Sequence, residues 1–271
     1  MRNIGKMKIT LTDQMQREIE IPKSPQRIIS LVPSQTELLF YLGLEKEVVG
    51  ITKFCVHPRA QFKSKPRVGG TKQYHFDKIK KLQPDLIIGN KEENDQTQIE
   101  QLAEEYPVWM SDIITLEDAL DMIEQIGKIV GREEKATQLI ENILLKFHHL
   151  NKYISLQKHF PKVAYLIWYN PMMVAARHTF INQMLQLAGF QNIFESQSRY
   201  PQVTKEELSA AQPDVILLSS EPFPFKEKHV KEIQDICPNS VIKLVDGELF
   251  SWYGNRLLLA VPYFEKLRRL T

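Results

Sequence analysis

Two stretches, one in each half of the chain, share one pattern: an acidic residue at the start of a short helix, then Gln-Pro-Asp, then an apolar run. They are Asp77–Ile88 and Glu206–Leu217. Because proline cannot continue a helix and disfavours the α conformation in the residue before it, Gln-Pro-Asp predicts a helix end and a turn. The apolar runs are typical of strands buried on both faces of a parallel sheet. Two such units predict two lobes of similar architecture.

The composition is that of an ordinary globular protein. The 271 residues are enough for two small domains or one large one, with 43% hydrophobic and 25% charged residues. Basic and acidic residues number 35 and 33, so the net charge of +2 predicts no nucleic-acid partner. No apolar stretch approaches the roughly 20 residues of a membrane helix. Met1–Leu11 has no apolar signal-peptide core, so we expect a cytoplasmic protein or a mature form.

Strand and helix patterns alternate along the chain. A hairpin is expected within Lys8–Ile21, a buried strand at Arg27–Val32, and a helix opened by a capping box at Ser34–Glu37. A second capping box, Thr204–Glu207, opens the helix of the second Gln-Pro-Asp unit. The alternation predicts an α/β fold: two Rossmann-like lobes, each built on a central parallel sheet.

The most periodic segment runs from Arg132 to about Lys158. Its apolar residues follow one face of a helix of roughly 40 Å. The segment is equally consistent with an ordinary surface helix and with a rigid connecting strut. We predict an N-terminal lobe (1–126), a backbone helix (127–160) and a C-terminal lobe (161–271), with a ligand cleft between the lobes.

Loops expected at the carboxyl ends of the strands are rich in rings, which suits a large, partly apolar, ring-shaped ligand. Trp168 continues a buried strand, so a core position is favoured for it over ligand contact. His57 precedes a proline, and a turn-stabilising role and a ligand or axial metal contact are equally open. Trp252 and Tyr253 could instead cover the core. The candidate ligand residues are Phe54, His57, Tyr74, Tyr169, Arg177, Tyr200, Trp252 and Tyr253.

Motifs for other chemistries are missing. There is no CxxC, no HExxH and no nucleophile–base pair, so we expect a binding protein with no intrinsic metal or cofactor, and not an enzyme. Cys55 and Cys237 lie one in each half and are expected to be free thiols. Any role of Cys55 is left open.

Several motifs, which follow one another along the chain in the same order as in one known family, resemble that family. They are Arg27–Leu38, Phe180–Leu185, Asn192–Phe194, Tyr200–Val203 and the two Gln-Pro-Asp units. Together they resemble class III substrate-binding proteins of ABC importers, which have one rigid backbone helix, and most of all the cobalamin-binding members. The resemblance implies a protein outside the cytoplasm that binds cobalamin or a related corrinoid and delivers it to a permease dimer.

The same resemblance implies roles for particular residues. Tyr200 would pack on the corrinoid, with Phe54 or His57 as a second contact and Tyr74 in place of a family tryptophan. Asp77 and Glu206 would meet arginines of the permease, where an acid in a first helical turn is favoured by the helix dipole. The protein is expected to act as a monomer.

Three alternatives remain. The fold could bind a ferric siderophore or haem, with Arg177, Arg199 and Arg256 serving anionic groups. It could be a cytoplasmic corrinoid-handling protein or enzyme. It could bind bare manganese or zinc, for which only His57, His75 and His178 are suitably placed.

Overall fold

Parallel strands and helices form two compact units. The computed structural model describes residues 7–271. The N-terminal unit holds the chain up to Ile113, Glu117–Glu141 and Tyr253–Asn255, and the C-terminal unit holds Ile114–Leu116, Asn142–Trp252 and Arg256–Thr271. The α/β fold class is confirmed, whereas the boundaries 1–126, 127–160 and 161–271 stay a prediction. Met1–Lys6, part of the stretch used for the signal-peptide expectation, lie outside the described residues.

The N-terminal unit contains the predicted hairpin and a parallel sheet. The hairpin pairs β1 (Lys8–Thr12) with β2 (Glu18–Pro22). The sheet has the order β4 (Val48–Ile51), β3 (Ile28–Ser30), β5 (Leu86–Asn90), β6 (Val108–Ser111), with every pair parallel. All five residues of β5 are buried, as its apolar run predicts.

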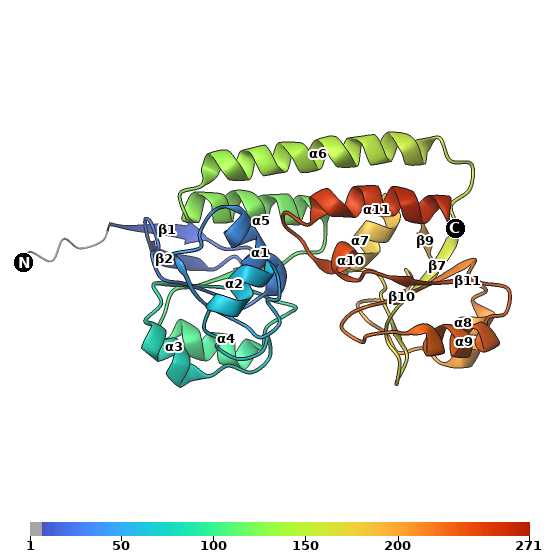
Figure 1. Ribbon diagram of the computed structural model, residues 1–271, viewed down its shortest axis with the longest axis horizontal. Helices are drawn as coiled ribbons and strands as arrows, with labels where there is room; N and C mark the ends of the chain where they lie inside the picture. Colours follow the sequence, from blue (N-terminus) through green and yellow to red (C-terminus); the bar gives the residue numbers. More distant parts are fainter. Residues whose placement is uncertain (1–6) are drawn as a thin grey trace, which may run out of the picture. The chain divides into compact units, whose positions relative to one another are not determined.

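Helices cover both faces of this sheet. Figure 1 shows α1 (Pro33–Tyr41) and α5 (Leu116–Ile129) on one side, and α3 (Phe76–Leu82) and α4 (Gln96–Ala103) on the other. On the second side, Ile79 and Leu102 from the helices join Ile29 and Ile87 from the strands in one buried cluster. A short helix, α2 (Arg59–Ser64), follows β4.

The C-terminal unit has a mixed sheet. Its order is β11 (Val241–Val245), β10 (Val215–Ser219), β7 (Lys162–Trp168), β8 (Met173–Val174), and β9 (Gln191–Asn192) also pairs with β7. Only β8 is antiparallel among these pairs. Figure 1 shows α7 (Phe180–Leu187), α10 (Glu248–Ser251) and α11 (Leu257–Arg269) on one side of this sheet, with α8 (Lys205–Ala210) and α9 (Glu227–Ile236) on the other.

The two Gln-Pro-Asp units form the same structure. Each joins a short helix to the strand that lies between two parallel neighbours, α3 to β5 and α8 to β10. Gln83 and Gln212 both adopt the left-handed conformation, with φ of 44° and 47°. This conformation ends the helix, and proline then directs the chain into the strand.

The aspartates of these units tie the central strand to its neighbour. The Asp85 carboxylate accepts hydrogen bonds from the backbone N–H groups of Gln26 (3.0 Å) and Arg27 (2.7 Å), just before β3. The Asp214 carboxylate accepts one from Lys162 at the start of β7 (2.8 Å). The repeated motif therefore has a structural role in both units: its aspartate fixes the relative position of two adjacent strands.

One of the two predicted capping boxes is wrong. The helix α1 begins with Pro33 at its first position and Val32 as its N-cap, with no side-chain cap, so Ser34 lies inside the helix. Proline is favoured at this first position because it has no N–H to satisfy and its φ suits the helix. The second box is confirmed, because Thr204 and Glu207 make both reciprocal hydrogen bonds at the start of α8.

The long helix is α6 (Glu133–Ser155), whose 23 residues span about 35 Å. The division between the units falls within it, between Glu141 and Asn142. One face is buried, through Ala136, Leu139, Ile143, Phe147, Leu150 and Ile154, as the periodicity predicts. Within residues 7–271, no helix has the length and apolar character needed to cross a membrane.

Candidate functional site

The predicted site residues fall into both units. In the N-terminal unit, Phe54 follows β4 with 49% of its surface exposed, and the Lys53 ammonium lies 5.0 Å from its ring centroid. His57 is partly exposed in the same loop. Between them, Cys55 is fully buried against the hydroxyls of Thr36 and Thr52, each 3.1 Å from its sulfur. Burial raises the pKa of this thiol, so Cys55 behaves as a core residue.

Tyr74 is mostly buried in the N-terminal unit. Only 7% of its surface is exposed, and its hydroxyl donates a hydrogen bond to the Thr71 carbonyl at 2.7 Å. Burial raises the pKa of the phenol above its ordinary value. Its ring belongs to the same buried cluster as Ile79 and Ile87. Its role as a ligand contact stays a prediction.

In the C-terminal unit, a group of five rings lies at the carboxyl ends of β7 and β10. Tyr169 stacks on Phe223 with centroids 5.9 Å apart, and Phe225 and His229 pack against both. Trp168 meets the edge of Phe223 at 5.6 Å. We call these residues the aromatic cluster. Four of them, Trp168, Phe223, Phe225 and His229, are missing from the candidate ligand residues drawn from the sequence.

The core position expected for Trp168 is wrong. The residue is 39% exposed, and its indole N–H donates to the Asn170 carbonyl at 3.1 Å. The five preceding residues of β7 are buried, so exposure begins where the strand ends. Tyr169 is half-buried, and its hydroxyl is hydrogen-bonded to the Glu232 carboxylate on α9. Trp168 and Tyr169 thus present ring surface at the edge of the aromatic cluster.

Arg177 and Tyr200 lie on two hydrogen-bonded loops of the C-terminal unit. Arg177 is exposed and precedes α7, while Tyr200 is half-buried and follows Arg199, whose guanidinium lies 5.7 Å from the Tyr200 ring centroid. The Arg199 N–H donates to the Arg177 carbonyl at 2.7 Å. His178 and Arg199 both have left-handed backbones, with φ of 63° and 65°. Such strain in residues other than glycine is frequent at functional sites.

Trp252 is held in place by polar contacts. Its indole N–H donates to the Glu221 carboxylate at 2.9 Å, and the Arg256 guanidinium lies 4.7 Å from its ring centroid. Arg256 is itself paired with Glu248 at 2.8 Å and is 9% exposed. This buried ion pair argues against the expectation that Arg256 serves an anionic ligand. Tyr253, only 5% exposed, is grouped with the N-terminal unit.

The two expected docking acids occupy equivalent positions. Asp77 lies in the first turn of α3 and Glu206 in the first turn of α8, and both are exposed. Neither serves as an N-cap, because α3 has no side-chain cap and α8 is capped by Thr204. Simple helix capping therefore does not account for them.

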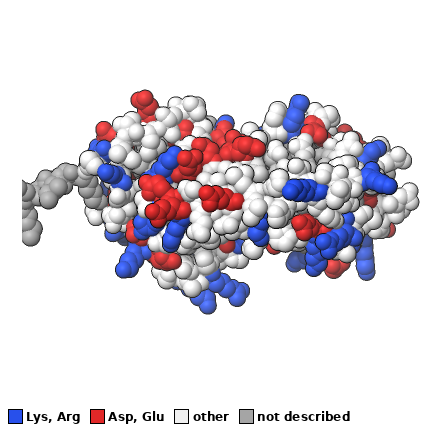
Figure 2. Space-filling view, turned by 90° about the horizontal axis from the view of Figure 1, so that it is seen from above, with Lys and Arg blue, Asp and Glu red and all other residues white. Residues whose placement is uncertain are grey.

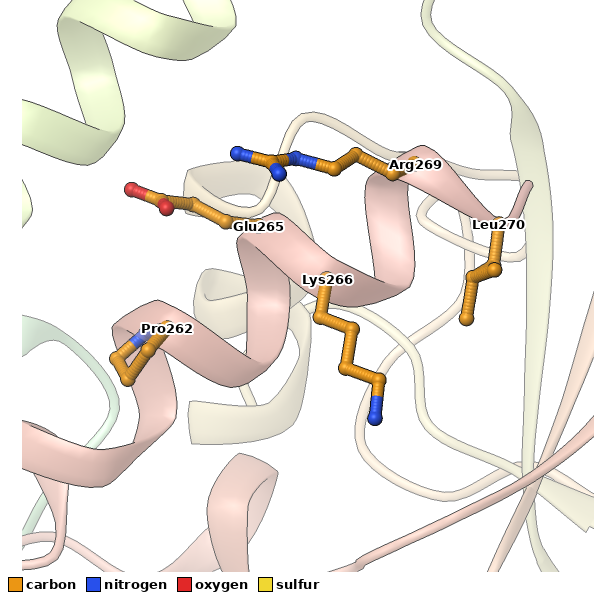
Figure 3. A pocket seen from close by; sticks show the side chains of 5 residues that line it. All are labelled: Pro262, Glu265, Lys266, Arg269 and Leu270. Atoms are coloured by element: carbon orange, nitrogen blue, oxygen red, sulfur yellow. The ribbon is translucent and has the colours of Figure 1, made fainter.

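Two surface hollows are lined by none of these residues. One, of about 250 Å³, is lined by four residues of α11 and by Leu270 just after it, and Glu265 and Arg269 extend to one side and Lys266 to the other (Figure 3). The other, of about 420 Å³, lies in the N-terminal unit, on which acidic side chains gather in the view of Figure 2. It is lined by Thr12, Asp13, Gln14, Gln16, Asp112, Asp118, Asp121 and Gln125.

Metal ligands do not converge in the described part of the chain. Across residues 7–271, no three His, Cys, Asp or Glu side chains are grouped so that they could hold a metal ion. This finding argues against a bare manganese or zinc site built on His57, His75 and His178. An axial contact from His57 to a metal chelate stays a prediction. Both cysteines are free thiols, as expected.

Comparison with known proteins places the chain in a family. Residues 28–236 match the family described as "Periplasmic binding protein". The chain belongs to this family. It has the class III form of an ABC-importer substrate-binding protein, so the resemblance drawn from its motifs is confirmed, and the family is one of transport binding proteins.

Individual relatives of this periplasmic binding protein differ in what their names state. An uncharacterized ABC transporter substrate-binding lipoprotein of Bacillus subtilis is 26% identical, covering 93% of this chain and 83% of its own. A vitamin B12-binding protein of Pectobacterium carotovorum is also 26% identical, over 87% of this chain and 86% of its own. A periplasmic heme-binding protein of Pseudomonas aeruginosa has the same fold, with a TM-score of 0.79, 22% identity and coverage of 90% and 92%.

Proposed function

We propose that this periplasmic binding protein captures cobalamin or a related corrinoid and delivers it to an ABC permease. The observation that carries the proposal is the aromatic cluster, whose exposed Trp168 and half-buried Tyr169 offer flat apolar surface at the ligand end of the C-terminal sheet. Phe54 offers similar surface at the end of β4. The vitamin B12-binding relative supports this choice.

Haem or a ferric siderophore is the second candidate. Exposed Arg177 and Arg199 could pair with carboxylates of such a ligand, and a heme-binding protein shares the fold. Titration of the purified protein with cyanocobalamin, haem and a ferric siderophore, followed by visible absorbance and tryptophan quenching, separates the candidates. Saturable binding of cyanocobalamin alone is expected. Binding of haem or siderophore alone would replace the corrinoid proposal, and binding of none would overturn both.

We propose that Asp77 and Glu206 contact arginines on the two permease subunits. Their exposure and their matched places in α3 and α8 support this role. The double variant Asp77→Ala, Glu206→Ala should keep its ligand affinity but fail to stimulate the permease ATPase. Glu227→Ala, an exposed first-turn acid of α9, is the matched control. Loss of ligand affinity in the double variant, or normal stimulation by it, would contradict the assignment.

We propose a location outside the cytoplasm and a monomeric state. The first follows from the family and from the lipoprotein among the relatives. Protease treatment of intact cells that express the protein from its natural locus should degrade it while a cytoplasmic marker survives. Light scattering at micromolar concentration should give a mass near 31.6 kDa.

A further inference from the structure

The Glu221 carboxylate joins two separate segments of the C-terminal unit. Glu221 follows the end of β10 and is partly buried. Its Oε1 atom accepts hydrogen bonds from Ser251 Oγ (2.7 Å) and from the Trp252 indole N–H (2.9 Å). Ser251 is the last residue of α10, and Trp252 follows it. This carboxylate therefore fixes the end of α10 to the end of the strand β10.

Glu221 also lies in the loop that carries two rings of the aromatic cluster. We call residues 220–225 the aromatic loop. Phe223 and Phe225 follow Glu221 by two and four residues, and Pro222 and Pro224 restrict φ along the loop. The Phe225 N–H donates to the Phe223 carbonyl (2.9 Å), which tightens the loop further. A displacement of Glu221 is therefore passed on to both rings, because the chain between them is stiff.

The space for the Glu221 side chain depends on a glycine. The Glu221 carbonyl accepts a hydrogen bond from Ser219 Oγ (2.5 Å), and the Gly247 N–H donates to Ser220 Oγ (2.9 Å). Gly247 has a φ of −63°, which any residue can adopt. A β-carbon at this position would nevertheless lie 2.3 Å from Ser219 Oγ and 2.7 Å from Glu221 Cγ. Gly247→Ala therefore displaces Glu221 without changing its chemistry.

Charged groups around Glu221 affect its titration. Burial raises the pKa of its carboxyl, and the negative charges of Glu248 and Asp246 raise it further, while its two hydrogen bonds act in the opposite direction. Arg256 is a nearby cation and is paired with Glu248 at 2.8 Å. An ionised carboxylate accepts stronger hydrogen bonds than a protonated one. The contacts of Glu221 with the end of α10 therefore weaken as the pH falls through its raised pKa.

Three titratable rings also surround the aromatic loop. Burial raises the pKa of the Tyr165 and Tyr263 phenols, so both are neutral below about pH 8. The His229 imidazole packs on Phe223 with centroids 5.2 Å apart, and burial lowers its pKa. Because His229 is present in the wild type and in every Glu221 variant, its titration cancels when their affinities are compared.

From these contacts we infer that Glu221 is a positioning residue for ligand capture: its carboxylate holds the aromatic loop against the end of α10 and so keeps the aromatic cluster in the arrangement that binds the ligand. The inference rests on the proposed function and adds a dependence on one proton to it. Glu221 acts through its neighbours, because its Oε1 atom is already engaged by Ser251 and Trp252. Ligand affinity should fall as Glu221 is protonated.

Variants at Glu221 and at the facing glycine test the inference. Affinity for cyanocobalamin, and for haem, is measured by absorbance titration between about pH 4.5 and about pH 8 for the wild type, Glu221→Gln, Glu221→Ala and Gly247→Ala. Glu227→Gln, at an exposed acid of α9, is the matched control and should bind as the wild type does. Circular dichroism checks that each variant is folded.

Glu221→Gln should bind the ligand about 3- to 10-fold more weakly than the wild type at about pH 8, because an amide oxygen accepts weaker hydrogen bonds. The ratio of the two affinities should fall towards one as the pH is lowered to about 4.5. Glu221→Ala and Gly247→Ala should each lose about 10- to 100-fold at about pH 8. A residue that served only folding would not give a ratio that changes with pH.

The Trp252 indole N–H reports on the same carboxylate in the ligand-free protein. Its NMR resonance is identified by its loss in Trp252→Phe. This resonance should shift with pH in the wild type and shift far less in Glu221→Gln, because the group that titrates beside it has been removed.

The same pH dependence of affinity in the wild type and Glu221→Gln, or wild-type affinity in Glu221→Ala, would overturn the inference and leave the proposed function standing. An indole shift of equal size in the wild type and Glu221→Gln would also overturn it. If the wild type binds neither cyanocobalamin nor haem, the proposed function fails and the inference fails with it.

Discussion

Removing the aspartate of each Gln-Pro-Asp unit should destabilise the protein to different degrees. Asp85 accepts hydrogen bonds from two backbone N–H groups at 2.7 and 3.0 Å and is partly buried, whereas Asp214 accepts one at 2.8 Å and has a side chain 48% exposed. A hydrogen bond to a charged group contributes about 1.5–3 kcal/mol, and less where water competes. Asp85→Ala should therefore cost about 2–3 kcal/mol and Asp214→Ala about 1 kcal/mol.

Urea unfolding followed by circular dichroism measures both losses. With a slope of about 2 kcal/mol/M, the midpoint should fall by about 1 M for Asp85→Ala and about 0.5 M for Asp214→Ala. Asp85→Asn keeps one acceptor oxygen and should lie between Asp85→Ala and the wild type. Asp235→Ala, at an exposed acid of α9, is the control and should change little.

Amide hydrogen exchange locates the effect. The N–H groups of Gln26 and Arg27 should exchange faster in Asp85→Ala, and that of Lys162 should be unaffected, with the reverse in Asp214→Ala. An equal loss of stability in the two alanine variants, or a larger loss for Asp214→Ala, would show that these carboxylates do not hold the adjacent strands together as the hydrogen bonds indicate.

Three further tests address local features. Gln83→Gly and Gln212→Gly should each increase the free energy of unfolding by about 0.5 kcal/mol, because glycine adopts the left-handed conformation without steric cost. The urea midpoint should therefore rise, and a lower midpoint would contradict this. Thr204→Ala should cost about 1 kcal/mol by removing a cap, whereas Ser34→Ala should cost less because Ser34 caps nothing. Burial raises the pKa of the Glu221 carboxyl above 4.5, so its contribution to stability is full below about pH 4.5 and is lost as the pH rises through the raised value. The stability of Glu221→Gln relative to the wild type should therefore increase between about pH 4.5 and 8. A difference in urea midpoint that stays constant over this range would refute the prediction.

Features set by local chemistry could be predicted from the sequence. The helix ends at Gln83 and Gln212 follow from the proline that comes next, and the buried face of α6 follows from its spacing of apolar residues. The start of α1 is instructive because two local signals compete there. Ser34 fits a capping box, yet Pro33 takes the first helical position, and the proline could have been read from the sequence.

Features that depend on contacts between distant residues could not be predicted in the same way. Backbone hydrogen bonds join residues near 175 to residues near 200, and no local pattern specifies this pairing. The aromatic cluster likewise needs Phe223 and Phe225 to meet Tyr169. A signal was nevertheless present, since Pro222, Phe223, Pro224 and Phe225 follow the strand of the second Gln-Pro-Asp unit.

The exposure of Trp168 changes which rings can contact a macrocycle. Tyr74, Trp252 and Tyr253 are each at most 7% exposed, so in the conformation described here little of their ring surface is open to stacking. Phe54 and Trp168, at 49% and 39%, have open ring surface. The apolar run of β7 predicts a core position for Trp168, but this residue is the last of the strand and is 39% exposed, with the Phe223 ring beside it. Because Trp168 lies at the end of β7, its ring is open to a ligand as well as to water. Trp168→Ala should therefore weaken corrinoid binding more than Trp252→Phe does. If an absorbance titration shows that Trp252→Phe weakens binding more than Trp168→Ala, the buried rings and not Trp168 stack on the ligand.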